Sequence, residues 1–129
     1  MQLEDTEGRT PLTLAIDRDA RRSVDALVAA GADLEARDGD GNTPIIRAAW
    51  GGHAAIVRAL AAAGADTAAR GSRGATLLIA AVDSGDVETV RAVLAQGVDR
   101  DAVDDEGSTA ADRAELLRET AVADLLAAA

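Results

Sequence analysis

The sequence contains no cysteine, lysine, phenylalanine or tyrosine, and only one tryptophan, Trp50, among its 129 residues. Without cysteine, disulfides and thiolate metal sites are excluded. Without other large rings, the core must be built from Ala, Val, Leu and Ile, which favours thin, closely packed helices. Arginine as the only strongly basic residue, together with abundant Ala and Gly, indicates a GC-rich, bacterial genome.

Basic residues are also scarce: the sequence has 13 arginines and 23 acidic residues, and its net charge is −10. This balance argues against nucleic acid or an anionic membrane as the main partner. The acidic excess is greatest over residues 104–129, where seven acids face two arginines. The first ten residues do not resemble a signal peptide, and uncharged runs such as 74–82 are too short to span a membrane. We therefore expect a cytoplasmic protein.

A 33-residue period runs through the chain. The stretches GRTPL, GNTPI, GATLL and GSTAA begin at Gly8, Gly41, Gly74 and Gly107. Further residue types keep the same register: Thr10, Thr43, Thr76 and Thr109; Ala15, Ala48, Ala81 and Ala114; Gly31, Gly64 and Gly97. A repeat of this length predicts stacked units, none of which can bury its apolar face alone.

The stretch GDGNTPIIRAA (39–49) shows how each unit begins. Gly41 can adopt a positive φ at a turn. Thr43 can cap a helix whose first residue is Pro44, since proline has no N–H to leave unpaired there. The pattern predicts helices over about 44–50 and 53–62, separated by a Gly-Gly break, with Gly64 as the C-terminal cap of the second.

A 33-residue unit that starts Gly-x-Thr-Pro-Leu resembles the ankyrin repeat, and the resemblance extends from about Asp5 to about Ala127. Residues 38–70 match best. They have the family's Gly-His at 52–53, Ile-Val at 56–57, Leu60 and Gly-Ala-Asp at 64–66. The resemblance implies an all-α repeat solenoid, an ankyrin-repeat stack of helix-turn-helix units joined by β-hairpin-like loops. We expect a single domain over 1–129, with repeats at about 5–37, 38–70, 71–103 and 104–129.

Several positions depart from the family pattern. The family's Thr-Pro-Leu-His motif, whose His hydrogen-bonds neighbouring repeats, has no His here; the corresponding residues are Thr13, Ile46, Ile79 and Asp112. We expect Thr13 to replace part of that bonding and the two isoleucines to replace it by packing. Repeat three has Gly71 instead of the turn Asp and Leu77 instead of Pro. Repeat four is the most divergent, with Ala110 instead of Pro and one residue deleted before its second helix.

The terminal repeats carry the polar stretches 17–22 and 112–119. The outermost faces of a stack meet water, so polar capping repeats are expected there. On this basis we expect a complete small solenoid, and the differences among its repeats favour a natural protein over an idealised design.

Catalytic residues are not predicted. His53 is the only histidine, and at the start of a second helix it is expected to make structural contacts. The run Asp104, Asp105 and Glu106 has two interpretations, a weak divalent-cation site or a solvated loop tip, and the second is favoured. The glycines recur where turns need them, and no lysine follows them as in a phosphate-binding loop. We therefore expect neither an enzyme nor a protein with a cofactor or metal.

The resemblance implies a concave groove formed by the loop tips and the exposed face of the first helices. The matching positions are Thr6, Glu7, Arg9, Asp17, Arg18, Asp40, Asn42, Trp50, Gly51, Ser72, Arg73, Asp83, Ser84, Asp105 and Glu106. Trp50 falls on a central repeat, and a tryptophan near the middle of a patch is a favoured binding anchor. The alternative is that Trp50 lies flat over Ala-rich neighbours and only packs. Acidic residues in the groove favour a partner with a basic surface.

Three classes of function follow from these observations. The leading one is a monomeric module that holds another protein in its groove, and a sharper form of it is an immunity or antitoxin-like inhibitor of a basic protein. The second is a self-associating structural protein, suggested by the apolar C-terminal stretch LLAAA (125–129). The third, a small-molecule or metal-binding protein, is disfavoured because an open groove encloses little.

Overall fold

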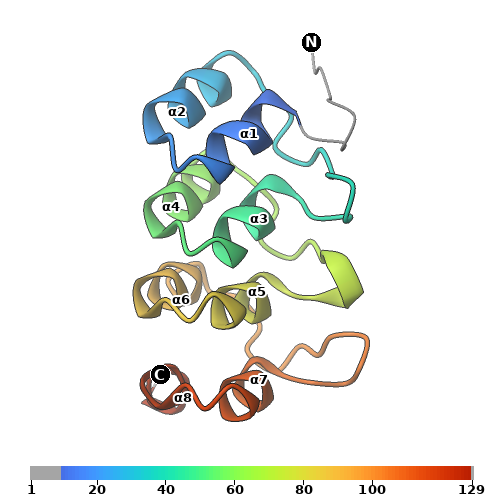
Figure 1. The fold of residues 1–129 in the computed structure, drawn as a ribbon, viewed down its shortest axis with the longest axis vertical. Coiled ribbons are helices and arrows are strands. Elements are labelled where there is room, and N and C mark those ends of the chain that lie inside the picture. The colour runs from blue at the N-terminus through green and yellow to red at the C-terminus, as the bar shows by residue number, and fades with distance from the viewer. Residues whose placement is uncertain (1–9, 129) are drawn as a thin grey trace.

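Four helix-turn-helix pairs are stacked in one direction in the computed structural model, which describes residues 10–128 (Figure 1). The first helix of each pair is α1 (Pro11–Asp17), α3 (Pro44–Trp50), α5 (Leu77–Ser84) or α7 (Ala110–Leu116). The second is α2 (Arg21–Ala29), α4 (Ala54–Ala62), α6 (Val87–Leu94) or α8 (Thr120–Ala128). A short 3-10 helix, η1 (Ser72–Gly74), lies in the loop before α5, and no strand occurs within residues 10–128.

The helices form two layers. The first helices α1, α3, α5 and α7 lie in one layer, the second helices α2, α4, α6 and α8 in the other, and the long loops project to one side (Figure 1). Each of these loops closes with the same backbone hydrogen bond, from Asp38 N–H to Asn42 O, Gly71 N–H to Ala75 O and Asp104 N–H to Ser108 O. The predicted hairpin-like loops are therefore present without strands of their own.

Threonine begins most of the first helices as predicted. The hydroxyls of Thr10, Thr76 and Thr109 each accept the backbone N–H three residues later, at 3.1–3.2 Å. Thr43 precedes α3 as expected, but its side chain makes no such bond, and its buried Oγ1 has no partner among residues 10–128. The predicted capping bond of Thr43 is therefore wrong, although the helix start is right. Gly41 and Gly64 have φ values of +86° and +99°, as their turns require.

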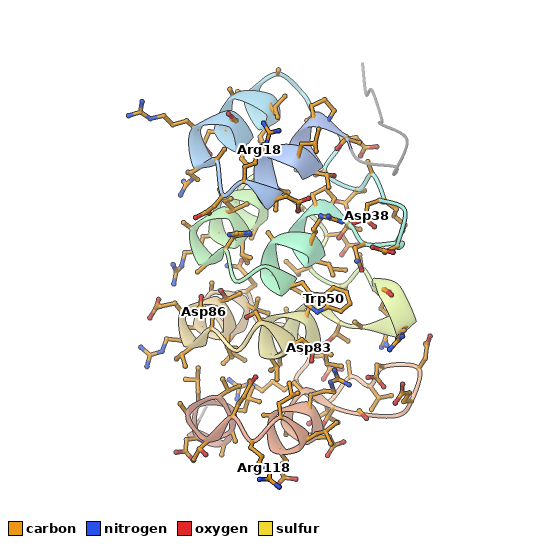
Figure 2. All side chains as sticks on the ribbon, in the orientation of Figure 1. Arg18, Asp38, Trp50, Asp83, Asp86 and Arg118 are labelled. Atoms are coloured by element: carbon orange, nitrogen blue, oxygen red, sulfur yellow. The ribbon has the colours of Figure 1, made fainter. Side chains whose placement is uncertain are left out.

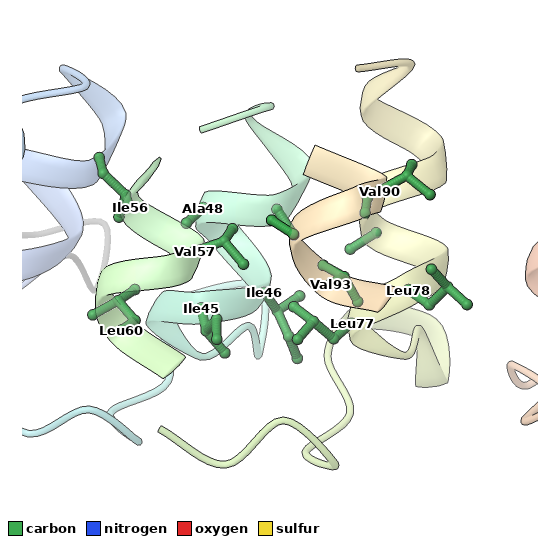
Figure 3. Packing of buried hydrophobic residues seen from close by; sticks show 14 of the residues in the cluster. Ile45, Ile46, Ala48, Ile56, Val57, Leu60, Leu77, Leu78, Val90 and Val93 are labelled. Atoms are coloured by element: carbon green, nitrogen blue, oxygen red, sulfur yellow. The ribbon is translucent and has the colours of Figure 1, made fainter. Parts of the chain in front are cut away.

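The core is a continuous layer of small and branched side chains between the two helical layers (Figure 3). Ala48 and Ala49 are fully buried and let adjacent helices approach closely, while Ile46 and Ile79 are buried at the positions where the family has His. Packing therefore does replace hydrogen bonding at these two positions. Thr13 does not play its expected part, because its hydroxyl pairs with Thr10 of its own repeat at 3.1 Å.

Two arginines link consecutive loops. The Arg37 guanidinium donates to Gly41 O at 2.7 Å and to Arg70 O at 2.5 Å. Arg70, one period later, donates to Gly74 O at 3.2 Å and to Val103 O. The 33-residue spacing of these arginines was visible in the sequence, and it is the signal that could have predicted this ladder.

The C-terminal end of the stack is more polar than its interior. On α7, Asp112 and Glu115 are exposed, in register with the buried Ile46 and Ala49 of α3. Polar residues thus occupy positions that are apolar inside the stack, as expected for a capping repeat. The cap is incomplete, because Leu116 is 72% exposed.

The turn inside each pair needs a left-handed residue. Gly52 and Gly85 supply it with φ values of +75° and +74°, but Asp19 and Arg118 occupy the same register with φ values of +53° and +57°. A side chain in this conformation costs free energy that glycine avoids. Asp19 has a compensating contact, since its carboxylate lies 3.2 Å from His53 Nδ1, whereas Arg118 forms no salt bridge with the rest of residues 10–128.

We expect Arg118→Gly to raise the free energy of unfolding by about 0.5–1 kcal/mol, because strain relief exceeds the added flexibility of the unfolded chain. Urea denaturation of the two proteins would measure the difference. Arg118→Ala is the matched control, since it removes the same side chain but keeps the strain, and it should give no gain. Equal stabilisation by both substitutions would contradict the strain account.

Candidate protein-binding face

Trp50 separates two hollows on the side of the stack where the first helices meet the loops. The larger hollow has a volume of about 500 Å³ and the smaller about 60 Å³, and both are lined by Trp50, Ser72 and Arg73. We call the set of residues lining the two hollows the Trp50 face: Asp17, Asp40, Asn42, Arg47, Trp50, Gly51, Ser72, Arg73, Ala75, Ile79, Asp83, Asp104, Glu106 and Arg113.

The indole of Trp50 is half-buried. It belongs to the last residue of α3, packs partly against the core, and lies between that helix and the η1 loop (Figure 2). One side of the indole therefore packs against the core, and the other side remains part of the surface, so the anchor role stays a prediction.

Arginine–aspartate pairs flank Trp50 at the junctions on either side. Arg47 binds Asp17 through two bonds, Nε to Oδ1 at 2.6 Å and Nη2 to Oδ2 at 2.8 Å, and a third bond reaches Asp38 Oδ2 at 2.5 Å. Arg113 binds Asp83 Oδ1 through Nη2 at 2.8 Å and Nε at 3.1 Å. The hydrogen bonds that Arg47 donates to Asp17 raise the pKa of Arg47, so this arginine keeps its charge and its partners. Each pair joins two consecutive repeats.

The middle junction breaks this pattern. Trp50 has the register of Asp17 and Asp83, and the buried Ala80 has the register of Arg47 and Arg113. At this junction a large aromatic side chain and a small one therefore occupy the positions of the ion pair. The result is an aromatic surface with an ion pair at the neighbouring junction on each side.

The Trp50 face carries an excess of negative charge. Five carboxylates and three arginines line the hollows, and Arg47 and Arg113 are already bound to aspartates. Within residues 10–128, Arg73 has no carboxylate oxygen within 4 Å of its guanidinium. The backbone N–H of Ser108 lowers the pKa of Asp104, which stays ionised. Asp40 and Glu106 are exposed carboxylates without an arginine partner in this part of the chain.

The η1 loop is held by a side chain from the preceding repeat. In the loops at 38–42 and 104–108, an aspartate accepts two backbone N–H groups: Asp38 from residues 40 and 42, Asp104 from residues 106 and 108. Gly71 has no carboxylate for this purpose, and Asn42 Oδ1 instead accepts Ser72 N–H at 2.8 Å. A Cβ atom on Gly71 would overlap Asn42 Oδ1. Asn42 thus fills the space that the missing side chain leaves.

Comparison with known proteins agrees with this architecture. The model of ankyrin repeats in three copies matches residues 1–71, and the model of a single ankyrin repeat matches residues 73–105. The chain belongs to the ankyrin-repeat family. No curated protein matches it. Ankyrin repeats are generally protein–protein interaction modules, and the predicted fold class, an all-helical repeat solenoid, is confirmed. No helix within residues 10–128 has the length and apolar character needed to cross a membrane.

The ankyrin stack brings only part of the predicted groove together. Thr6, Glu7 and Arg9 lie outside the described residues. The predicted residues that line the Trp50 face are Asp17, Asp40, Asn42, Trp50, Gly51, Ser72, Arg73, Asp83 and Glu106. Arg18, Ser84 and Asp105 line neither hollow.

Two of the predicted groove residues, Asn42 and Ser84, are engaged in contacts within the protein. Asn42 is only 6% exposed, because it is committed to the η1 loop. The Ser84 hydroxyl donates to Ala81 O at 2.6 Å and accepts Asp86 N–H at 3.1 Å, so it completes the turn after α5. The prediction also omits Arg47 and Arg113, which anchor the face on both sides.

His53 makes structural contacts, as predicted. It precedes α4, its Nδ1 lies 3.2 Å from Asp19 Oδ1, and its ring lies where a side chain on Gly51 would project. In the described part of the chain, no three His, Asp or Glu side chains are placed to hold a metal ion. The Asp104–Glu106 tip instead uses one carboxylate oxygen of Asp104 to bind its own backbone.

Below the Trp50 face, Glu119 is a carboxylate in an unfavourable place. Its Oε2 is buried and has no hydrogen-bond partner among residues 10–128. Burial raises the pKa of Glu119, and the nearby Asp83 carboxylate raises it further. The folded protein therefore binds this proton more tightly than the unfolded chain does. Its stability falls as pH rises from the unfolded pKa through the folded one.

We accordingly expect Glu119→Gln to stabilise the protein at pH 7 by about 1 kcal/mol or less, because the amide carries no charge to desolvate. The advantage should disappear as pH falls below the ordinary pKa of Glu, where wild-type Glu119 is protonated as well. Thermal melts of both proteins between pH 3.5 and pH 8 would measure this. An advantage that stays constant over this range would contradict the titration of Glu119 as its cause.

Proposed function

We propose that this ankyrin stack is a single, non-catalytic domain over residues 1–129 that binds another protein through the Trp50 face. The observation that carries the proposal is the break in the pattern of ion pairs. The central junction has a half-exposed indole in place of the Asp–Arg pair found on both sides of it. The fold does not require a tryptophan at this register, because the two flanking junctions close without one.

The surroundings of Trp50 fit a binding anchor. Hot-spot residues are enriched in tryptophan, cluster near the centre of an interface and sit in hollows that a partner can fill. Trp50 lies between two hollows, and Gly51 beside it adds no side chain that would obstruct a partner. The self-paired Arg47 and Arg113 clusters would form the polar rim that such an anchor needs.

The charge of the face supports a partner with a basic surface. Over the two hollows together, five carboxylates outnumber three arginines, and such complementarity mainly accelerates association. Inhibition of one basic protein, as an immunity or antitoxin-like factor, is the sharper form of this proposal, and it requires tight one-to-one binding. We propose a monomer, because Leu125 and Leu126 of the apolar C-terminal stretch pack partly against the core. The cytoplasmic location and bacterial origin stay predictions from the sequence.

Affinity capture from a lysate of the source organism tests this function, with wild type compared with Trp50→Ala. We expect a protein held by wild type to be lost with Trp50→Ala, a cost of about 2 kcal/mol or more in binding. Leu116→Ala is the matched control, because Leu116 has the same register as Trp50 and is exposed in repeat four. Equal retention by wild type and Trp50→Ala, with both folded by circular dichroism, would contradict the proposal.

A further inference from the structure

We infer that the partner presents arginine side chains to the Trp50 face, with a guanidinium stacked on the indole and hydrogen-bonded to Asp40 or Glu106. This inference rests on the proposed function and specifies the chemistry of the partner. It follows from the charges of the two hollows, where neither carboxylate forms a salt bridge with an arginine within residues 10–128.

Docking on this face removes water from its carboxylates. Asp40 lines the larger hollow and Glu106 the smaller, and both are exposed. An apolar partner group would bury them without compensation, which is costly for an ionised group. Arg47 already serves Asp17 and Asp38, Arg113 serves Asp83, and Arg73, the third arginine of the face, forms no salt bridge within residues 10–128. One unpaired arginine cannot balance both carboxylates, so a partner that buries them supplies further positive charge.

The indole selects the kind of cation. A cation over the face of tryptophan is attracted by the ring quadrupole, and this attraction grows as water is excluded. A guanidinium is planar, stacks on aromatic faces and keeps its N–H donors free at its edge for carboxylates. The ammonium group of lysine is compact and strongly hydrated, so it cannot make both contacts equally well. An aromatic ring between two carboxylate-lined hollows therefore favours arginine over lysine.

Arg73 is the one cation of the face that opposes this binding. It lines both hollows beside Trp50 and has no acidic partner within residues 10–128. Its removal should strengthen the binding of a cationic partner, whereas removal of Asp40 and Glu106 should weaken it. The opposite signs of the two effects distinguish charge recognition from a loss of packing.

Two blocked octapeptides, in which glycine alternates with either four arginines or four lysines, test the inference. Calorimetry would measure their affinity, and the emission of Trp50, the only tryptophan, would report contact at the ring. We expect the arginine peptide to bind about fivefold more tightly than the lysine peptide. The double variant Asp40→Asn/Glu106→Gln should weaken it about tenfold, and Arg73→Ser should strengthen it.

The matched control is Asp101→Asn/Asp124→Asn, which removes the same charge from two exposed residues that line neither hollow. It should leave the affinity nearly unchanged. A second variant, Trp50→Leu, keeps an apolar side chain in the packing position and should bring the arginine-to-lysine ratio close to one. Equal affinity for the two peptides, no binding of either, or the same loss in the control would overturn the inference.

The captured partner separates this inference from the proposed function. If the partner is lost with Trp50→Ala but binds Asp40→Asn/Glu106→Gln as well as wild type, the face binds a protein without arginine recognition. In that case the inference fails and the proposed function stands. If the partner is retained by Trp50→Ala, the proposed function itself fails.

Discussion

Gly71→Asp should lower the free energy of unfolding by about 2 kcal/mol, although aspartate is the residue that the repeat pattern predicts at this position. Asp38 and Asp104 occupy the same register and each bind two backbone N–H groups of their loop. The difference at Gly71 is the neighbour from the repeat before. A Cβ atom there would overlap Asn42 Oδ1 and would lie 3.0 Å from Ile46 Cγ2.

The collision cannot be relieved cheaply. Asn42 is almost fully buried, and its Oδ1 already accepts Ser72 N–H at 2.8 Å. If the Asn42 side chain moves to make room for the new aspartate, it loses its hydrogen bond with Ser72 N–H. A buried amide without a hydrogen-bond partner is costly. Gly71 and Asn42 therefore form a complementary pair, in which one residue has no side chain and the other uses the space.

The next junction shows the alternative pair. Ala75 has the register of Asn42, and Asp104 has the register of Gly71. At this junction the small side chain is therefore at the Asn42 position, and the polar side chain, the carboxylate of Asp104, is at the Gly71 position. Ile79 has the register of Ile46 and lines the same hollow as Ala75 and Asp104, so an isoleucine at this register does not prevent the exchange. Adding Asn42→Ala to Gly71→Asp should then restore most of the lost stability.

A double-mutant cycle in urea would measure this coupling. Asn42→Ala alone should cost about 1 kcal/mol, because Ser72 N–H loses its acceptor, and the double variant should lie close to wild type. Additive losses in the double variant, or a Gly71→Asp protein as stable as wild type, would contradict the complementary pair.

This pair also shows which parts of the structure the sequence could predict. Helix starts, turn glycines and the buried face of each helix depend on residues close together in one repeat, and the 33-residue period transfers them to every repeat. Gly41, Pro44 and Ile46 were placed correctly for this reason. The position of Asn42 depends on a side chain that is missing in the next repeat, so its own repeat gives no sign that it is buried.

The ion pairs of the Trp50 face are a different case, because a signal for them exists. Asp17 and Arg47 are 30 residues apart, and so are Asp83 and Arg113. This spacing is one period minus about one helical turn, which places the two side chains on adjacent first helices. A search for opposite charges at this offset would have found both pairs. It would also have shown that Trp50 and Ala80 replace the pair at the central junction.

Arg47→Met should lower the free energy of unfolding by about 3 kcal/mol, which is a larger loss than we expect from Gly71→Asp. Arg47 makes three short bonds to two carboxylates, and one of them, Asp38, has a side chain that is only 2% exposed. Methionine preserves much of the volume and removes the charge. Asp38 would then keep the backbone N–H groups of residues 40 and 42 but lose the cation that balances it.

Two comparisons separate this effect from a general loss of surface charge. Arg58→Met removes an exposed arginine that pairs with Glu88 at 3.1 Å, and such a pair contributes less than about 1 kcal/mol. Arg47→Lys keeps the charge but not the two-pronged contact with Asp17, so its stability should lie between those of wild type and Arg47→Met. Chemical denaturation of the three variants against wild type would give this order directly.

If the deficit of Arg47→Met is as small as that of Arg58→Met at pH 7, the three bonds do not hold repeats one and two together. The polar rim proposed for the Trp50 face would then lose its support on that side.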